Sequence, residues 1–326
     1  MATGAPVNPD VANAIPELVE AGALPPDKAP LLLRAARREL VSVHGELRLL
    51  LYVGVLLLTG GVGVLVKENL DRIGPAAIAA GIGLAAAASF AWVIRVAPPF
   101  SWREVRSPNL GFDYILLLGV LLAAADLAYV EVQFTPLGPN WTWHLLIVAL
   151  LAGLAAVRFD SRIVFSLALT TFAAWRGVSV AGVGHGAFNG SEDAVRWNTI
   201  ACGVLFVGIG LALVRTGRKA HFEPVAAHLG WLLILGGLAS GMGESGAWPL
   251  YTLALLACGA GLAAGAYHFR RFPLFAYGVL AGYAALSRFI FEVDAFEILG
   301  CFWFFGTTLL LLFGLIFVQR RMKEPL

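Results

Sequence analysis

The amino-acid sequence predicts an all-α membrane protein, a polytopic transmembrane helical bundle of about ten helices that follows a small N-terminal cytoplasmic helical hairpin. Composition is the first reason, because 59% of the 326 residues are hydrophobic and only 13% are charged. Soluble domains are about 45–50% apolar and about 25% charged. The second reason is length, since ten apolar stretches approach the roughly 17–25 residues that a spanning helix needs. The third is the alternation of basic residues between successive connections.

The predicted spans are separated by short polar connections. They cover residues 49–66, 73–94, 111–130, 141–157, 163–180, 197–214, 225–240, 248–267, 273–290 and 298–318. Spans 141–157 and 225–240 lie at the lower limit of length, so their ends are uncertain by about one helical turn. The fifth and seventh spans are also compatible with broken or re-entrant helices.

Basic residues fix an expected orientation. Of the 23 Lys and Arg, 18 lie in the N-terminal arm, in every second connection and in the C-terminal tail. Cytoplasmic loops carry such an excess in membrane proteins, so both termini are predicted to be cytoplasmic. The same charges suit contact with anionic membrane lipids. The cytoplasmic hairpin, the transmembrane bundle and a basic cytoplasmic tail are then expected at residues 1–47, 48–318 and 319–326.

Turn signals divide the N-terminal arm into two helices. The first is expected over residues 11–22 and ends at Gly22. After two prolines, Asp27 is a suitable cap for a second, amphipathic helix over about 28–47. This hairpin either packs on the bundle or presents a surface, over residues 11–47, that docks a protein partner.

Small residues recur four positions apart in several spans, and close backbone approach through them drives helix packing in lipid. The pairs are Gly237/Gly241, Gly261/Gly265 and Gly278/Gly282. We expect them to be internal contacts of one bundle, with a homodimer face as the alternative. A faint similarity between residues 54–81 and 203–230 also fits two five-helix halves of opposite orientation.

Features of the first part of the chain resemble a known family. They are the short hairpin at residues 15–24, a glycine-rich first span with Gly60, Gly61 and Gly63, and Asn69 and Asp71 directly after it. Over about the first 175 residues the chain resembles the domain of unknown function 2157 family of prokaryotic membrane proteins. Leu70 stands where that family has an aromatic residue, and Gln133 matches a recurrent glutamine. The resemblance implies a multi-pass protein of the prokaryotic plasma or inner membrane, and it implies no activity.

Ionisable groups at membrane depth are functional candidates because they are costly in hydrocarbon. Counted from the cytoplasmic ends of their spans, Asp126, Arg176 and Arg288 lie at roughly 20–23 Å, at ~1.5 Å per residue. Other titratable side chains stand nearby at the outer side, namely Glu131, His144 and Glu292. One interpretation is an outward-facing polar cavity, with Asp126 paired to an arginine, that binds a small charged solute or relays protons. The other is structural, with arginines that extend to the interface and an acid that locks two helices.

Other chemistry finds little support in the sequence. No Cys or His spacing indicates a metal or cofactor site, and the three cysteines lie singly inside predicted spans. No basic arm with interleaved aromatic residues indicates nucleic-acid binding. His221 and Glu223 are expected to be solvated. We therefore favour a non-enzymatic carrier or solute-binding protein. The alternative is a structural or regulatory membrane subunit whose hairpin docks a partner.

Overall fold

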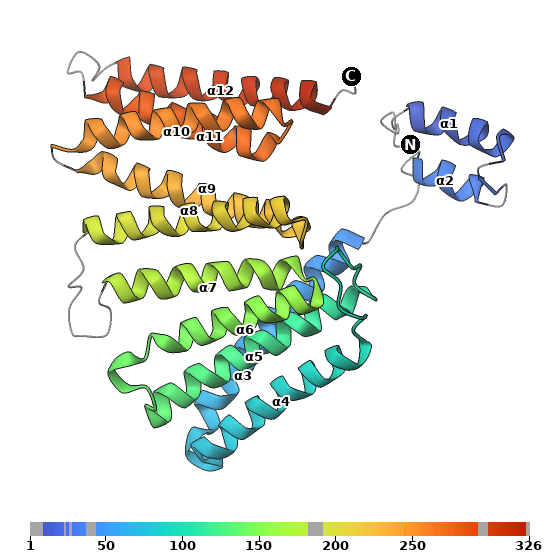
Figure 1. Ribbon diagram of the computed structural model, residues 1–326, viewed down its shortest axis with the longest axis vertical. Coiled ribbons are helices and arrows are strands. Elements are labelled where there is room, and N and C mark those ends of the chain that lie inside the picture. The colour runs from blue at the N-terminus through green and yellow to red at the C-terminus, as the bar shows by residue number, and fades with distance from the viewer. Residues whose placement is uncertain are drawn as a thin grey trace. The chain divides into compact units, whose positions relative to one another are not determined.

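Helices make up every regular element in the part of the chain that the structure describes. Figure 1 shows the computed structural model, in which residues 9–22, 24–25, 28–36, 44–181, 192–244, 246–292 and 299–323 are described. The helices are α1 Pro9–Glu20, α2 Ala29–Ala36, α3 His44–Ile73, α4 Pro75–Val96, α5 Leu110–Phe134, α6 Trp143–Phe159, α7 Arg162–Ala181, α8 Glu192–Thr216, α9 Glu223–Ser240, α10 Trp248–His268, α11 Phe272–Phe291 and α12 Leu299–Lys323. Short 3₁₀ turns are found at Gly138–Asn140, Ala220–Phe222 and Gly241–Gly243. The predicted all-α class is confirmed.

Each of the ten predicted spans coincides with one helix from α3 to α12. Within the described residues, seven helices are long and apolar enough to cross a membrane, namely α4, α5, α7, α8, α9, α10 and α11. Two shorter apolar helical stretches are Leu49–Gly61, inside α3, and Trp143–Phe159, which is α6. The polytopic bundle is therefore confirmed, and ten is an approximate number of crossings.

The chain contains two compact units, Met1–Leu57 and Leu58–Leu326. In the first unit α1 packs against α2, and Ile15 of α1 is buried. Gly22 follows α1 with φ +70°, as its place at the predicted helix end requires. Residues 37–43 of the predicted second helix lie outside the described residues. The boundaries proposed at residues 47 and 318 stay predictions.

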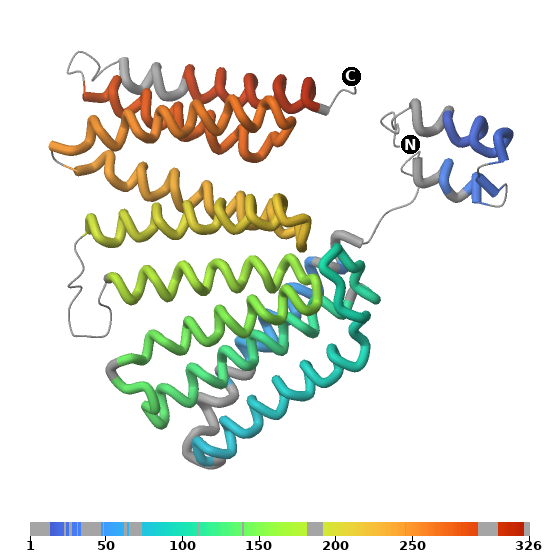
Figure 2. The backbone as a smooth tube through the Cα atoms, in the orientation of Figure 1, coloured from blue at the N-terminus to red at the C-terminus, as the bar shows by residue number. Residues whose placement is uncertain are grey.

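The second unit is built from antiparallel helix pairs in chain order. The pairs are α4/α5, α6/α7, α8/α9 and α10/α11, and α12 packs on α11. The tube in Figure 2 shows the same order. The connections at residues 97–109, 160–161, 217–222 and 269–271 therefore share one end of the unit, which we call the basic end. The other connections lie at the opposite end.

Glycines allow two of these pairs to approach closely. A Cβ on Gly203 of α8 would lie 2.6 Å from the carbonyl oxygen of Gly230 on α9. Similarly, a Cβ on Gly278 of α11 would lie 2.5 Å from the carbonyl oxygen of Gly259 on α10. The predicted small-residue contact is thus present at Gly278. By contrast, the two glycines of the predicted 261/265 pair face open space.

Large apolar side chains cover the outside of the helices. Leu84, Leu154 and Leu250 are 70%, 73% and 73% exposed. Less than half of each of the seven candidate spans is buried inside the protein. Because soluble monomers rarely expose so much contiguous apolar surface, lipid is the surrounding that this surface fits. The chain is a multi-pass helical membrane protein.

Candidate functional site

Asp126 lies on α5 where that helix packs against α4. Its Oδ2 is so close to Gly83 that a Cβ there would be 3.1 Å away. Its Oδ1 is buried and has no hydrogen-bond partner among the described residues, and the hydroxyl of Tyr129, three residues further on, is in the same state. The α4/α5 contact around them is apolar, with a core of Ile78, Ile82, Ala86 and Leu122. Asp126 is therefore a carboxyl group with unused hydrogen-bonding capacity between two apolar helices.

Arg176 is bound within a different pair of neighbouring helices. From α7, its Nε donates a hydrogen bond of 3.1 Å to Oδ1 of Asn198 on α8. Its guanidinium lies 5.7 Å from the centroid of the Trp175 ring. These contacts attach α7 to α8.

Arg288 is held still further along the chain. From α11, its Nε donates a 3.2 Å hydrogen bond to the carbonyl oxygen of Met242, in the connection between α9 and α10. The guanidinium also pairs with Glu292 in the next turn and lies 4.6 Å from the centroid of the Trp248 ring. Among the described contacts, neither Arg288 nor Arg176 reaches Asp126.

Glu131 and His144, two of the titratable residues expected at the outer side, have local backbone partners. Glu131 is buried, and its Oε2 accepts a 3.0 Å hydrogen bond from the backbone N–H of Leu137, which closes the turn after α5. His144 contacts the carbonyl oxygen of Trp141 through Nδ1, and the two rings are stacked. Both side chains thus order the connection from α5 to α6.

Two of the family-motif residues, Asn69 and Asp71, lie near the end of α3, but their side chains are outside the described part of the structure. The third, Gln133, is exposed in the last turn of α5. The sequence-predicted candidates therefore share the opposite end of the second unit without converging on one described cavity. Within the described residues, no three His, Cys, Asp or Glu side chains are grouped as metal ligands would be.

A buried arginine that sequence reasoning missed also lies at this end. Arg196 of α8 is 5% exposed. It pairs with Asp193 and, at 2.7 Å, with Glu244, and its Nε donates to Oγ of Ser240 over 3.3 Å. Its guanidinium lies 5.0 Å from the ring centroid of Tyr251 on α10. Arg196 therefore ties α8 to α9 and α10.

The basic end contains a buried ion cluster, made of Asp160, Lys219 and His221. Nζ of Lys219 lies 2.6 Å from Oδ2 of Asp160, and the two side chains are 1% and 4% exposed. Nε2 of His221 is 3.0 Å from the other carboxylate oxygen, at an angle that does not make a hydrogen bond. The prediction that His221 is solvated is wrong, because its partner comes from the α6–α7 turn. Glu223 is buried too, and it pairs with Arg271.

Backbone and ring contacts also hold the connections around the buried ion cluster. The N–H of Lys219 donates a 2.7 Å hydrogen bond to the carbonyl oxygen of Trp102, in the α4–α5 connection. Lys219 Nζ also lies 4.9 Å from the centroid of the Phe100 ring. Asp160 and Lys219 both adopt left-handed backbone conformations, with φ 60° and 50°. Three connections at the basic end are therefore fastened to one another.

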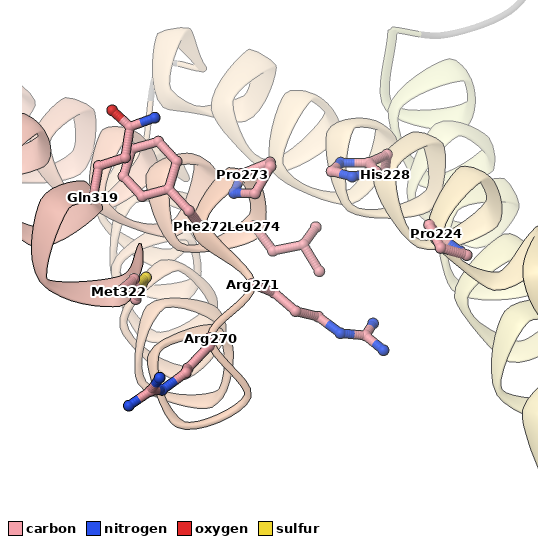
Figure 3. Close-up of a pocket in the computed structure, with 9 residues that line it drawn as sticks. All are labelled: Pro224, His228, Arg270, Arg271, Phe272, Pro273, Leu274, Gln319 and Met322. Atoms are coloured by element: carbon pink, nitrogen blue, oxygen red, sulfur yellow. The ribbon is translucent and has the colours of Figure 1, made fainter. Parts of the chain in front are cut away.

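A pocket of about 410 Å³ opens at the basic end, among α9, the α10–α11 turn and α12. Figure 3 shows the residues that line it, which are Pro224, His228, Arg270, Arg271, Phe272, Pro273, Leu274, Gln319 and Met322. Nδ1 of His228 is buried with no hydrogen-bond partner in the described structure. In the sequence, the two arginines contribute only to the charge bias between connections.

Comparison with known proteins supports the membrane class and adds no activity. Residues 16–165 match the family described as predicted membrane protein (DUF2157), which is just under half of the chain. This match confirms the resemblance seen in the hairpin and the first spans. The chain matches no curated protein and no solved structure.

Proposed function

We propose that this multi-pass membrane protein binds a proton or a small cation at Asp126, and that it acts as a carrier or solute-binding protein. The observation that supports this is the unpartnered Oδ1 of Asp126, buried between α4 and α5. An ionised carboxylate among apolar side chains is costly unless a positive charge compensates it. A bound proton or cation supplies that compensation, and neither arginine of the predicted polar level does so.

The proposal narrows the wider expectation of an outward-facing cavity for a small charged solute. Arg176 and Arg288 hold neighbouring helices through Asn198 and Met242. Among the described residues, Asp126 lies beside Gly83 in a largely apolar helix contact that also contains Tyr129, and Gly83 leaves room where a Cβ would press on the carboxylate. Within the part of the chain that the structure describes, the site has one acid and no fixed base, which favours a cationic ligand over an anionic one.

Carbodiimide labelling tests the proposal, because the reagent attacks protonated carboxyl groups in apolar surroundings. The full-length protein in lipid nanodiscs is treated with dicyclohexylcarbodiimide, and the adduct is mapped by mass spectrometry. We expect an adduct on Asp126 that forms more slowly when pH rises or when Na⁺ is added. The Asp126→Asn variant should lose it.

The matched control is Asp113→Asn, on the same helix. Asp113 accepts a 2.7 Å hydrogen bond from Oγ of Ser107 and lies at the basic end. In proteoliposomes with a pH-sensitive dye inside, Asp126→Asn should abolish any proton flux that the Asp113→Asn variant retains. A protein that never labels at Asp126, or that labels at a rate independent of pH and Na⁺, contradicts the proposal.

The alternative, a structural or regulatory subunit whose residues 11–47 dock a protein partner, has one observation in its favour. In the first unit Leu18 and Leu32 are 46% and 38% exposed, although Ile15 between the same helices is buried. A photo-crosslinker at position 18 in intact cells tests it. A single protein adduct that a Leu32→Glu change removes supports this role, and adducts with lipid alone contradict it.

A further inference from the structure

A second unpartnered polar atom lies one helical turn from Asp126. The hydroxyl of Tyr129 is buried and, like Oδ1 of Asp126, has no hydrogen-bond partner within the described residues. Tyr129 packs against the apolar core of the α4/α5 contact, in which Asp126 lies beside Gly83. Buried polar atoms are nearly always hydrogen-bonded in folded proteins, so each exception needs a reason. Two exceptions in one helix contact point to a shared reason.

Helical spacing places these two side chains on the same side of α5. Residues three positions apart on a helix are neighbours, with Cβ atoms about 5–6 Å apart. Long helical side chains lean back toward the N-terminus of their helix, so a tyrosine at position 129 is directed to the turn that carries Asp126. On α4, Gly83 has no Cβ and leaves the carboxylate space to turn. The carboxyl group and the hydroxyl can therefore meet by rotation of side-chain bonds, without a movement of the backbone.

Few other oxygen atoms are available in the described α4/α5 contact. Ser89 carries the only side-chain oxygen of α4, more than one turn from Gly83, and its hydroxyl donates to the carbonyl oxygen of Ala85 over 2.9 Å. On α5, Glu131 already accepts a bond from the N–H of Leu137. The backbone carbonyls of both helices accept helical hydrogen bonds. What remains is one carboxyl group and one hydroxyl.

That set of oxygen atoms suits a proton better than a metal ion. Ca²⁺ and Mg²⁺ take about six or more oxygen ligands, and a monovalent cation needs oxygen atoms in place of its hydration shell. A proton needs a single acceptor. The protonated carboxyl group is then an O–H donor, and a tyrosine hydroxyl can accept from it. The same hydroxyl can donate to the carboxylate once the proton has left.

We propose that the ligand at Asp126 is a proton and that the hydroxyl of Tyr129 is its second partner. This inference rests on the proposed function and narrows its ligand from any small cation to a proton. In the loaded state the carboxyl O–H of Asp126 donates to the oxygen of Tyr129. After the proton has passed to water, the O–H of Tyr129 donates to the carboxylate. Tyr129 keeps its own proton in both states, so the site exchanges one proton with the solvent.

Infrared difference spectroscopy of the full-length protein in lipid nanodiscs, between acidic and alkaline pH, tests the role of Tyr129. A protonated carboxyl group has a C=O band, which moves to a lower wavenumber when the group is hydrogen-bonded. We expect such a band at acidic pH, and Asp126→Asn should remove it. Tyr129→Phe keeps the ring and loses only the hydroxyl, so the band should remain but lie at a higher wavenumber. The matched control, Tyr114→Phe, changes another buried tyrosine, at the basic end of α5, and should leave the band unmoved.

Carbodiimide labelling of Asp126 tests the identity of the ligand. At one pH and one ionic strength, the adduct should form at the same rate in sodium chloride and in choline chloride. Each pH unit above the midpoint of labelling should slow it about tenfold, because only the protonated carboxyl group reacts. Slower labelling in sodium chloride, or an unmoved infrared band in Tyr129→Phe, overturns this inference and leaves the proposed function standing. The absence of any adduct at Asp126 overturns both.

Discussion

The buried ion cluster and the pocket lie at the same end of the molecule and start from the same turn geometry. In both, a charged residue ends a helix in a left-handed conformation: Asp160 after α6 and Arg270 after α10. Asp160 pairs with Lys219 from the α8–α9 connection, and both side chains are buried. Arg270 lines an open pocket instead.

The difference teaches that turn geometry alone does not decide what a charge does. The turn fixes the direction of the side chain, and the neighbouring connection decides the outcome. Where the α8–α9 connection supplies an opposite charge, the turns are fastened together. Where α12 supplies Gln319 and Met322, the charge faces a cavity.

The largest effect is expected where the buried ion cluster is broken. Changing Asp160→Asn leaves the ammonium of Lys219, only 1% exposed, without its counter-charge. Removing one partner of a buried pair costs about 3–5 kcal/mol. We expect the free energy of unfolding, measured by denaturant titration in detergent with tryptophan fluorescence, to fall by about that amount. The double variant Asp160→Asn with Lys219→Met should recover a large part, and a fall no smaller in the double variant would contradict the pairing.

The sequence predicted the helices better than the contacts between them. Apolar runs bounded by polar residues locate spanning helices because lipid leaves no other partner for the backbone, and α10 agrees with its predicted span within one residue at each end. Contacts across connections leave no such local signal. His221 looked solvated because its partner, Asp160, comes from a different turn. Asp126 was expected to pair with Arg176 or Arg288, yet Arg176 bonds to Asn198 and Arg288 to the carbonyl oxygen of Met242, and no described contact joins either arginine to Asp126.

A smaller effect is expected at the pair that flanks the pocket. The Arg271 side chain is 47% exposed, whereas that of its partner Glu223 is 10% exposed. Solvent screens a pair of this kind, so Arg271→Gln should lower the free energy of unfolding by no more than about 1 kcal/mol. The same titration measures it. A loss as large as that of Asp160→Asn would mean that the pocket arginine is as structural as the buried ion cluster.

The last comparison, which separates the two regions most sharply, places glycine at each left-handed position. Arg270→Gly removes about 1–2 kcal/mol of backbone strain but adds about 0.4–1 kcal/mol of unfolded-state entropy. The net change should lie between zero and a gain of about 1.6 kcal/mol. Asp160→Gly relieves the same backbone strain but leaves the buried ammonium of Lys219 without its counter-charge. The free energy of unfolding should therefore fall. Opposite signs in parallel titrations indicate that Asp160 is held by its buried partner, whereas the Arg270 side chain contributes less to stability than its backbone conformation costs; a loss in both would assign the two turns the same structural role.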